Sequence, residues 1–379
     1  MNRNPNSQSI LHLTDYGAPY EGNFVASLRA LEQRLGADGM RMLYVFPKRA
    51  GDMPWAQNMR REKSNVFLIE RNGFFAYARQ IRKLLRENDV AILHAHFIHY
   101  KEKLAALFAA NTCGHRVDTV LHLHNHLAIP KSPLRALPQR FYLSFVSRFV
   151  CCSRSVAQRL IADGIAPSRV AVAENAIAFE RLDSYEPLSK EALGIPFCER
   201  VALLFGFNYL RKGVDLAVEA VRSLREAGEP VTLAVVLSSR KEEVETAILR
   251  QLDLPELPAW IKLLPARSDV AAYYHLADVF LSPSREEGFC YALVEAAYCK
   301  TPVLASAIDA QKDLALPPEA FVPPEDAAAL SSAIQRVFHA PDTPERTQTL
   351  EAAKRRVVDS YALNIWSESV IRVYSEIHA

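Results

Sequence analysis

Residues 282–305 read SPSREEGFCYALVEAAYCKTPVLA, and this stretch decides the fold of the chain around it. The apolar residues 279–281 that precede it predict a short strand, and residues 302–305 predict the next strand. Between the two strands, residues 291–299 lack glycine and proline and predict a helix of at least two turns. A strand, a turn, a helix and a further strand form the repeating unit of a Rossmann-like α/β domain.

The turn of this unit contains Gly288, Phe289 and Cys290 and is predicted to lie where free backbone N–H groups converge at a helix N-terminus. Such a terminus attracts an anion, above all a phosphate, through its N–H groups and the helix dipole. Glu287 stands in the turn, and Glu295 follows about one helical turn inside the helix. Carboxylates are good acceptors for sugar hydroxyls and poor partners for phosphate. The pattern therefore indicates a nucleotide-sugar, with a hydroxylated ring on either side of a diphosphate.

Residues 284–296, with the Thr-Pro-Val-Leu-Ala that follows at 301–305, resemble the signature of the family 4 retaining glycosyltransferases. The core of that signature is a glutamate, seven residues and a second glutamate, which Glu287 and Glu295 match. The spacing alone is also typical of a solvated helix face with two unrelated carboxylates. The Glu-Gly-Phe turn and the two flanking strands favour the signature. The resemblance implies that Glu287 lies near the transferred sugar and that Glu295 holds the donor ribose.

The resemblance also implies donor contacts in two further segments. Ala266 and Arg267 follow a predicted strand, at the place where family members pack the donor base. Further contacts are expected along the turn into the helix, at Gly288, Phe289, Cys290, Tyr291 and Ala292. The family usually carries glycine where Cys290 stands, so this turn carries a side chain instead.

A second signature lies at the start of the C-terminal half. Residues 201–206 predict a buried strand that ends in glycine, and Asn208, Arg211 and Lys212 follow before a predicted helix. This pattern resembles the family's glycine-ended strand followed by Arg-Lys-Gly. As isolated residues the two cations would be surface charge, but beside the acidic signature they fit a diphosphate and would neutralise the leaving group. Many members carry arginine directly after the strand glycine, where Phe207 stands here.

The N-terminal half opens with a predicted strand at 10–14, a glycine-containing loop and a predicted helix at 24–35. This order is typical of a nucleotide-binding α/β unit. The glycines of the loop could equally serve turn geometry alone. In the resembling family this loop faces the interdomain cleft and touches the donor phosphate or the acceptor, so Gly22 and Asn23 are the candidate donor contacts.

Five histidines gather at the ends of two predicted strands of this half, at His94, His96, His122, His124 and His126. Residues two apart in a strand face the same side of the sheet. A zinc site is one interpretation, but no Cys, Asp or Glu completes a ligand set at the usual spacing, and we expect no metal. The resemblance offers another interpretation, because family members carry a histidine after this strand that reaches the donor sugar. His124 matches it best and His126 is the alternative register, whereas His94 and His122 are expected in the core.

Two basic segments with apolar periodicity, at 74–87 and 130–149, allow two interpretations. Each could place its charges in solvent and its apolar face inside its own domain. Each could also dock against anionic lipid head groups or a lipid-linked acceptor.

Composition limits the class of protein. The 379 residues suit two domains, and 45 basic residues nearly balance 43 acidic ones, which gives no reason to expect a nucleic-acid partner. No stretch is apolar enough to span a bilayer, the N-terminus lacks the apolar core of a signal peptide, and the six cysteines show neither disulfide nor metal-ligand spacing. We therefore expect a cytoplasmic protein, either free or peripheral at the inner face of the membrane.

The resemblance implies two Rossmann-like domains that face a central cleft, the GT-B architecture. We expect an acceptor-binding domain at 1–182, a linker at 183–200, a nucleotide-sugar-binding domain at 201–360 and a helix at 361–379 that returns to the first domain.

The expected activity is metal-independent transfer of a sugar, with retention, from a nucleotide-diphosphate-sugar to an acceptor hydroxyl. A UDP-sugar is the expected donor. The acceptor could be a glycan, a lipid-linked molecule or a small molecule, in the synthesis of a glycan, a cell-surface polysaccharide or a glycoconjugate. The catalytic candidates are His124, Glu287, Arg211 and Lys212. Two alternatives remain, a non-catalytic glycosyltransferase-like subunit and a GT-B nucleotide-sugar epimerase.

Overall fold

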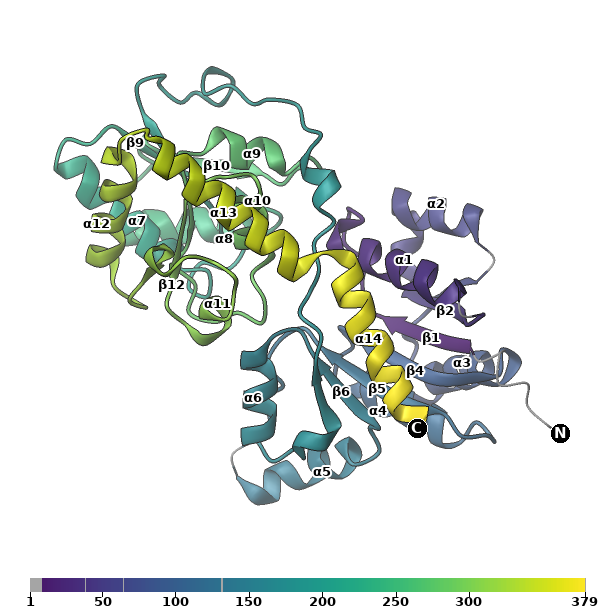
Figure 1. The fold of residues 1–379 in the computed structure, drawn as a ribbon. Coiled ribbons are helices and arrows are strands. Elements are labelled where there is room, and N and C mark those ends of the chain that lie inside the picture. Colours follow the sequence, from purple (N-terminus) through teal and green to yellow (C-terminus); the bar gives the residue numbers. More distant parts are fainter. Residues whose placement is uncertain (1–8, 38, 64, 131, 379) are drawn as a thin grey trace. The chain divides into compact units, whose positions relative to one another are not determined.

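The computed structural model describes residues 9–37, 39–63, 65–130 and 132–378, and the chain forms two compact units (Figure 1). Unit 1 comprises Met1–Ala176 and Leu363–Ala379, and unit 2 comprises Ile177–Ala362. Residues 183–200, the predicted linker, are part of unit 2.

The sheet of unit 1 has the strand order β3-β2-β1-β4-β5-β6-β7, and its described strand pairs are parallel. The strands are β1 (Ser9–Thr14), β2 (Arg41–Pro47), β3 (Val66–Ile69), β4 (Val90–His96), β5 (Asp118–Leu123), β6 (Arg148–Cys151) and β7 (Val170–Val172). The α-helices are α1 (Gly22–Ala37), α2 (Pro54–Glu62), α3 (Phe74–Glu87), α4 (Tyr100–Asn111), α5 (Pro133–Leu143), α6 (Arg154–Ala162) and α14 (Leu363–His378). Short 3-10 turns occur at Lys48–Asp52 and Pro167–Arg169.

The core of unit 1 is closed by the C-terminal helix. Trp366, Val370 and Val373 recur at helical spacing on α14 and are buried against the same core as Ile10 of β1 and Val120 of β5. The helix also packs against α1, and Figure 1 shows it lying across the strands of this unit. The predicted return of the terminal helix to the first domain is therefore confirmed.

The sheet of unit 2 has the order β10-β9-β8-β11-β12-β13, and its described strand pairs are parallel. The strands are β8 (Arg200–Phe205), β9 (Val231–Leu237), β10 (Ile261–Pro265), β11 (Val279–Ser282), β12 (Val303–Ser306) and β13 (Phe321–Val322). The α-helices are α7 (Val214–Glu226), α8 (Lys241–Leu252), α9 (Ala271–Leu276), α10 (Tyr291–Tyr298), α11 (Asp309–Lys312), α12 (Ala327–His339) and α13 (Pro344–Tyr361). Short 3-10 turns occur at Phe179–Leu182, Glu191–Leu193 and Pro318–Ala320.

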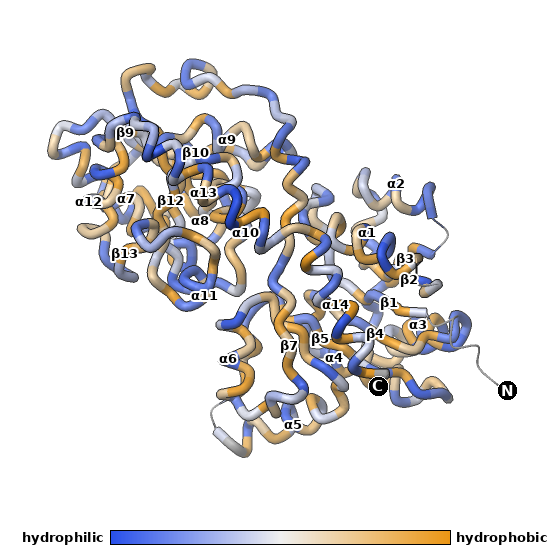
Figure 2. Tube along the Cα trace, viewed as in Figure 1, coloured by the Kyte–Doolittle hydropathy of each residue, from blue (hydrophilic) through white to orange (hydrophobic). Residues whose placement is uncertain are grey.

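The strands of both sheets are predominantly apolar because helices cover them, as expected for parallel sheets (Figure 2). In β9, residues 231–237 are all buried. The predicted α/β fold class, with two Rossmann-like units, is confirmed. In both sheets the strand order reverses beside the first strand, β1 in unit 1 and β8 in unit 2. The loops after these strands therefore lie at the position where α/β proteins bind ligands.

β6 (Arg148–Cys151) ends shortly before Ser153, whose side chain accepts the Val156 N–H as the N-cap of α6. The helical C-terminal segment is interrupted at Ala362, which is extended and bridges to Ile177. This interruption separates α13 of unit 2 from α14 of unit 1.

Candidate functional site

The loops after β8 and β11 bring Lys212 and Glu287 together. The Lys212 ammonium donates to Glu287 Oε1 at 2.6 Å, and the Ser284 hydroxyl donates to the same oxygen at 2.8 Å. The side chains are only 15% and 5% exposed, so this is an ion pair largely removed from water. A buried pair of this kind contributes little net stability, but it holds both charged groups in fixed positions.

An aromatic ring lies beneath the two adjacent cations. Phe207 has its ring centroid 5.3 Å from the Arg211 guanidinium carbon and 5.1 Å from the Lys212 nitrogen. Asn208 fixes the turn, since its Oδ1 accepts the Arg211 backbone N–H at 3.1 Å. Phe207 stands where many family members have arginine, and here it supports the cations through cation–π contact.

The loop after β8 packs directly on the loop after β11. Gly213 has φ +66, and a Cβ built there would lie 2.0 Å from the carbonyl oxygen of Pro283. The Arg285 N–H donates to the Arg211 carbonyl at 2.9 Å, and the Arg285 side chain forms a bidentate pair with Asp215. The two signatures are thus locked together by backbone contact.

The second glutamate of the signature is held by residues that the sequence analysis missed. Glu295 is buried in α10, where it pairs with Arg181 through Oε1 and accepts from the Tyr274 hydroxyl through Oε2 at 2.8 Å. Burial and the adjacent carboxylate keep the pKa of Tyr274 well above its ordinary value, so the hydroxyl remains a donor. Arg181 lies 114 residues from its partner, and no local pattern marks it.

The turn into α10 carries the predicted anion-binding features. Cys290 is the N-cap residue, and its side chain forms no capping hydrogen bond, while Tyr291 and Ala292 begin the helix. The thiol lies 3.5 Å from the Ser282 hydroxyl, and burial, the largest influence, raises its pKa. A neutral thiol adds no negative charge to the turn. Phe289 is buried against the Tyr361 ring at 5.3 Å and anchors the turn, and Gly288 before it is also buried.

The predicted base-binding segment follows β10. The Ala266 N–H donates to the Leu237 carbonyl at 3.2 Å. The Arg267 guanidinium forms a bidentate pair with Asp269, at 2.8 and 2.7 Å. Because its side chain is engaged in this way, Arg267 can hold the loop in shape, and contacts to a ligand would fall to the backbone.

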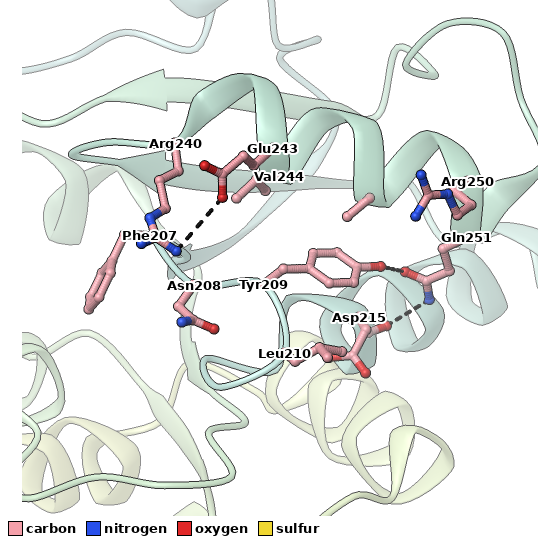
Figure 3. A pocket seen from close by; sticks show the side chains of 11 residues that line it. Phe207, Asn208, Tyr209, Leu210, Asp215, Arg240, Glu243, Val244, Arg250 and Gln251 are labelled. Atoms are coloured by element: carbon pink, nitrogen blue, oxygen red, sulfur yellow. Dashed lines mark hydrogen bonds and ion pairs between the residues drawn. The ribbon is translucent and has the colours of Figure 1, made fainter.

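A pocket of about 690 Å³ lies beside the loop after β8, and Phe207 and Asn208 are among the residues that line it (Figure 3). Tyr209 crosses its floor and donates to Gln251 of α8, which in turn donates to the Asp215 carbonyl. Figure 3 shows that this side of the loop is braced by α8. Asn208 was predicted to bind the donor, but the contact that the structure gives it is to the protein backbone.

The remaining predicted site residues lie in unit 1. His124 borders a cavity of about 300 Å³ after β4 and β5 and stacks on the Phe97 ring at 3.9 Å. Phe97 has φ +57, a left-handed conformation that is rare for an aromatic residue and typical of functional sites. Helix α1 begins at Gly22, which has φ +62, and the next residue, Asn23, is buried.

The structure therefore gathers the predicted residues into two groups. In unit 2, Lys212 contacts Glu287 beside Arg211 and the turn at 288–292. Glu295 lies further along α10, where Arg181 and Tyr274 hold it. Gly22, Asn23 and His124 lie in unit 1 and belong to a separate constellation. His94 and His122 are buried at 0% and 3% exposure, as expected for core residues.

Comparisons with known proteins agree with this division. The sequence profile of the family described as "Glycosyl transferases group 1" matches residues 187–356, and that of "Glycosyltransferase Family 4" matches residues 25–181. Together the two profiles span most of the chain. The D-inositol 3-phosphate glycosyltransferase of Mycobacterium bovis is 28% identical over 186 residues, which are 47% of this chain and 38% of that protein.

Solved structures share the fold over nearly the whole chain. A glycosyltransferase from Rickettsia africae has a TM-score of 0.79 and 19% identity, covering 98% of this chain and 99% of that chain. HepE of Anabaena in complex with UDP-glucose has a TM-score of 0.76 and 16% identity, covering 97% and 99%. At these identities the likeness establishes the fold.

Proposed function

Because this chain belongs to the group 1 glycosyltransferases of family 4, we propose that it transfers a sugar from a nucleoside-diphosphate-sugar to an acceptor hydroxyl. The transfer retains the configuration of the anomeric carbon. The observation that carries this proposal is the buried contact between Lys212 and Glu287, beside Arg211 and the start of α10.

The donor diphosphate binds between Arg211, Lys212 and the N-terminus of α10. As the bond to the sugar breaks, negative charge grows on the leaving phosphate, and fixed cations in a water-poor site stabilise it strongly. Lys212 then exchanges Glu287 for phosphate, which leaves Glu287 to accept a sugar hydroxyl. Two adjacent cations supply the charge that a metal ion supplies in other transferases, so the proposed reaction is metal-independent.

Glu295 holds the ribose hydroxyls of the donor. Arg181 and Tyr274 fix the orientation of this carboxylate. The base lies against the segment at Ala266 and Arg267. We assign a uridine nucleotide, in line with the structures of HepE with UDP and with UDP-glucose. In unit 1, His124 and the loop at Gly22 and Asn23 are the residues that we assign to sugar recognition.

A thermal-shift titration tests the donor site. UDP-, GDP-, ADP- and dTDP-sugars are titrated against the wild type, Lys212→Ala and the exposed control Lys241→Ala, and the ligand-induced shift is compared, since Lys212→Ala alters the unliganded protein as well. At a concentration 100 times Kd, one nucleotide should add about 2.7 kcal/mol of stability. That corresponds to roughly 5–10 °C for a unit of this size. Lys212→Ala should lose this shift and Lys241→Ala should keep it. If none of these donors shifts the wild type, the non-catalytic subunit becomes the better assignment.

We also propose that α5 of unit 1 touches the membrane surface and that the acceptor is lipid-linked. Leu134, Leu137 and Phe141 are 85%, 64% and 68% exposed on this helix, which also carries Arg135 and Arg140. Exposed apolar side chains between cations favour the interface of an anionic bilayer. Among the described residues, no helix has both the length and the apolar character to cross a membrane.

Co-sedimentation with vesicles that contain anionic lipid tests the membrane contact. Phe141→Ser should lower the bound fraction, with about a tenfold weaker partition coefficient from the loss of one inserted aromatic side chain. Phe197→Ser is the matched control, because Phe197 is 93% exposed in unit 2. Equal binding by the two variants and the wild type would remove α5 from the interface.

A further inference from the structure

A continuous chain of hydrogen bonds runs through the core of unit 1 and ends at His124. The Tyr374 hydroxyl of α14 lies 2.5 Å from His94 Nδ1 and 3.3 Å from His12 Nε2. His12 Nδ1 is 3.0 Å from His96 Nε2, and His96 Nδ1 is 3.3 Å from His124 Nε2. The Tyr374 hydroxyl and His124 are therefore linked by three consecutive hydrogen bonds.

The sheet register explains why these rings meet. His12 of β1 pairs with His94 of β4, and His96 of β4 pairs with His122 of β5. Because residues two apart on a strand share a face, the imidazoles form one layer beneath α14. The helix then contributes the Tyr374 hydroxyl at one end of this layer.

The protons on this chain can be arranged in only two consistent ways. Burial keeps the pKa of His12 and His124 at about 3, and holds those of His94 and His96 well below the usual value, so each ring is neutral and carries one proton. If the Tyr374 hydroxyl donates to His94, every ring of the chain carries its proton on Nε2. If it donates to His12 instead, every ring carries its proton on Nδ1.

The two ends of the chain are alike. His94 Nε2 and His124 Nδ1 are both buried without a hydrogen-bond partner, so each arrangement leaves one unpartnered N–H at one end and one unpartnered lone pair at the other. In both arrangements the four rings carry their protons on the same ring nitrogen, and the Tyr374 hydroxyl joins His94 to the other three.

We propose that Tyr374, acting through His12 and His96, holds His124 in the single tautomer that His94, His12 and His96 share. Tyr374 is thus a positioning residue at the far end of the chain, on a helix that a sequence comparison would assign to packing. His124 borders the cavity of about 300 Å³ in unit 1. Its consequence for transfer rests on the proposed function, in which His124 contacts the sugar, but the tautomer itself does not.

The same imidazoles could instead surround a metal ion. Two sets of three have ligand atoms within 4.8 Å of one another, His12, His94 and His96, and His96, His122 and His124. Both sets need His96, whose two nitrogens are already bonded to neighbouring rings. A metal ion bound to His96 would replace one of these hydrogen bonds, so the continuous hydrogen-bond chain and a filled metal site exclude each other.

Nuclear magnetic resonance of the full chain labelled with ¹⁵N-histidine tests the proposal, because long-range ¹H–¹⁵N correlations report which ring nitrogen carries the proton. The wild type should show His94, His12, His96 and His124 protonated at the same ring nitrogen. In Tyr374→Phe the ring is kept and the hydroxyl is lost, so His124 should change to the other tautomer or to an average of the two, and should no longer match His94. Tyr44→Phe is the control, because Tyr44 is equally buried in this core and bonds to a backbone carbonyl outside the chain.

Three results would overturn the proposal. These are a wild type in which His94 and His124 carry their protons on different ring nitrogens, an unchanged His124 in Tyr374→Phe, and stoichiometric zinc or copper bound by these rings in the purified protein. Should Tyr374→Phe fold poorly, His12→Phe interrupts the next link, and His124 should respond in the same way.

An activity measurement then tests the hydrogen-bond chain and the proposed function separately. With a working assay, kcat of Tyr374→Phe should fall about tenfold at unchanged donor KM, the loss of one hydrogen bond to the transition state. An altered tautomer with full activity would contradict the sugar contact of His124 and leave the chain intact.

Discussion

Replacing Gly213 by alanine should lower the free energy of unfolding of unit 2 by about 3 kcal/mol or more, and should abolish donor binding. The added Cβ would stand 2.0 Å from the carbonyl oxygen of Pro283 and 2.7 Å from its carbonyl carbon. These are backbone atoms, which cannot rotate away as a flexible side chain can. One of the two signature loops must therefore move.

The displaced loop carries the acidic half of the site. Pro283 precedes Ser284, whose hydroxyl holds Glu287 against Lys212. A shift of this backbone by even an ångström would separate the carboxylate from the ammonium and disturb the approach to α10. Loss of stability and loss of donor binding should therefore appear together.

Gly228→Ala is the matched control for this experiment. Gly228 has φ +89, and a Cβ there meets no heavy atom within 4 Å, so the change adds only the left-handed penalty of about 1 kcal/mol. Thermal unfolding should show a loss of roughly 10 °C for Gly213→Ala and about 3 °C for the control. Equal losses would mean that the contact with Pro283 contributes nothing.

Much of the unit 2 site was predictable because its residues lie in local patterns. Alternating strands and helices placed Arg211 and Lys212 after β8, and Glu287 and Glu295 around the start of α10. The close contact of Lys212 with Glu287 was less accessible, since 75 residues separate them. Only the strand order, which places β8 beside β11, brings their loops together.

Other contacts were not predictable, because no short-range pattern encodes them. Arg181 reaches Glu295 from a 3-10 turn 114 residues earlier, and Tyr374 reaches His94 across 280 residues. Alternation showed that histidines would share a face of the sheet, but it could not show which helix covers that face. Phe207 appeared only as a departure from the family pattern, and its place beneath the cations required the folded loop.

Acid should unfold unit 1 more steeply than its composition suggests, because it buries five neutral imidazoles. Burial lowers the pKa of His12 and His124 to about 3, and the pKa values of His94, His96 and His122 lie well below the ordinary value of 6.5. Below pH 6.5 the unfolded chain binds protons that the folded unit rejects. The free energy of unfolding of unit 1 therefore has its full value above about pH 6.5, and it decreases as the pH falls from 6.5 towards 3.

The expected size of this effect is large. Each such histidine removes about 1.4 kcal/mol per pH unit once its unfolded form is protonated. His12 and His124 together remove about 3 kcal/mol per unit, and five rings would remove about 7. Since domains are stable by only about 5–15 kcal/mol, unit 1 should unfold between about pH 6 and about pH 4.

Urea titrations at several pH values, read by hydrogen exchange of β4 and β5, measure this dependence. His122→Leu should reduce the slope of the unfolding free energy against pH by the contribution of about one proton. The substitution should stabilise the unit most at low pH. Both nitrogens of the His122 ring are buried without a hydrogen-bond partner, so an apolar replacement removes a desolvation cost rather than a contact. His99→Gln, at an exposed side chain, should leave the steepness nearly unchanged. Stability that stays flat from pH 7.5 to pH 5.5 would mean that the imidazole layer admits protons or water, and a layer of that kind could not hold the single tautomer on which the role of Tyr374 depends.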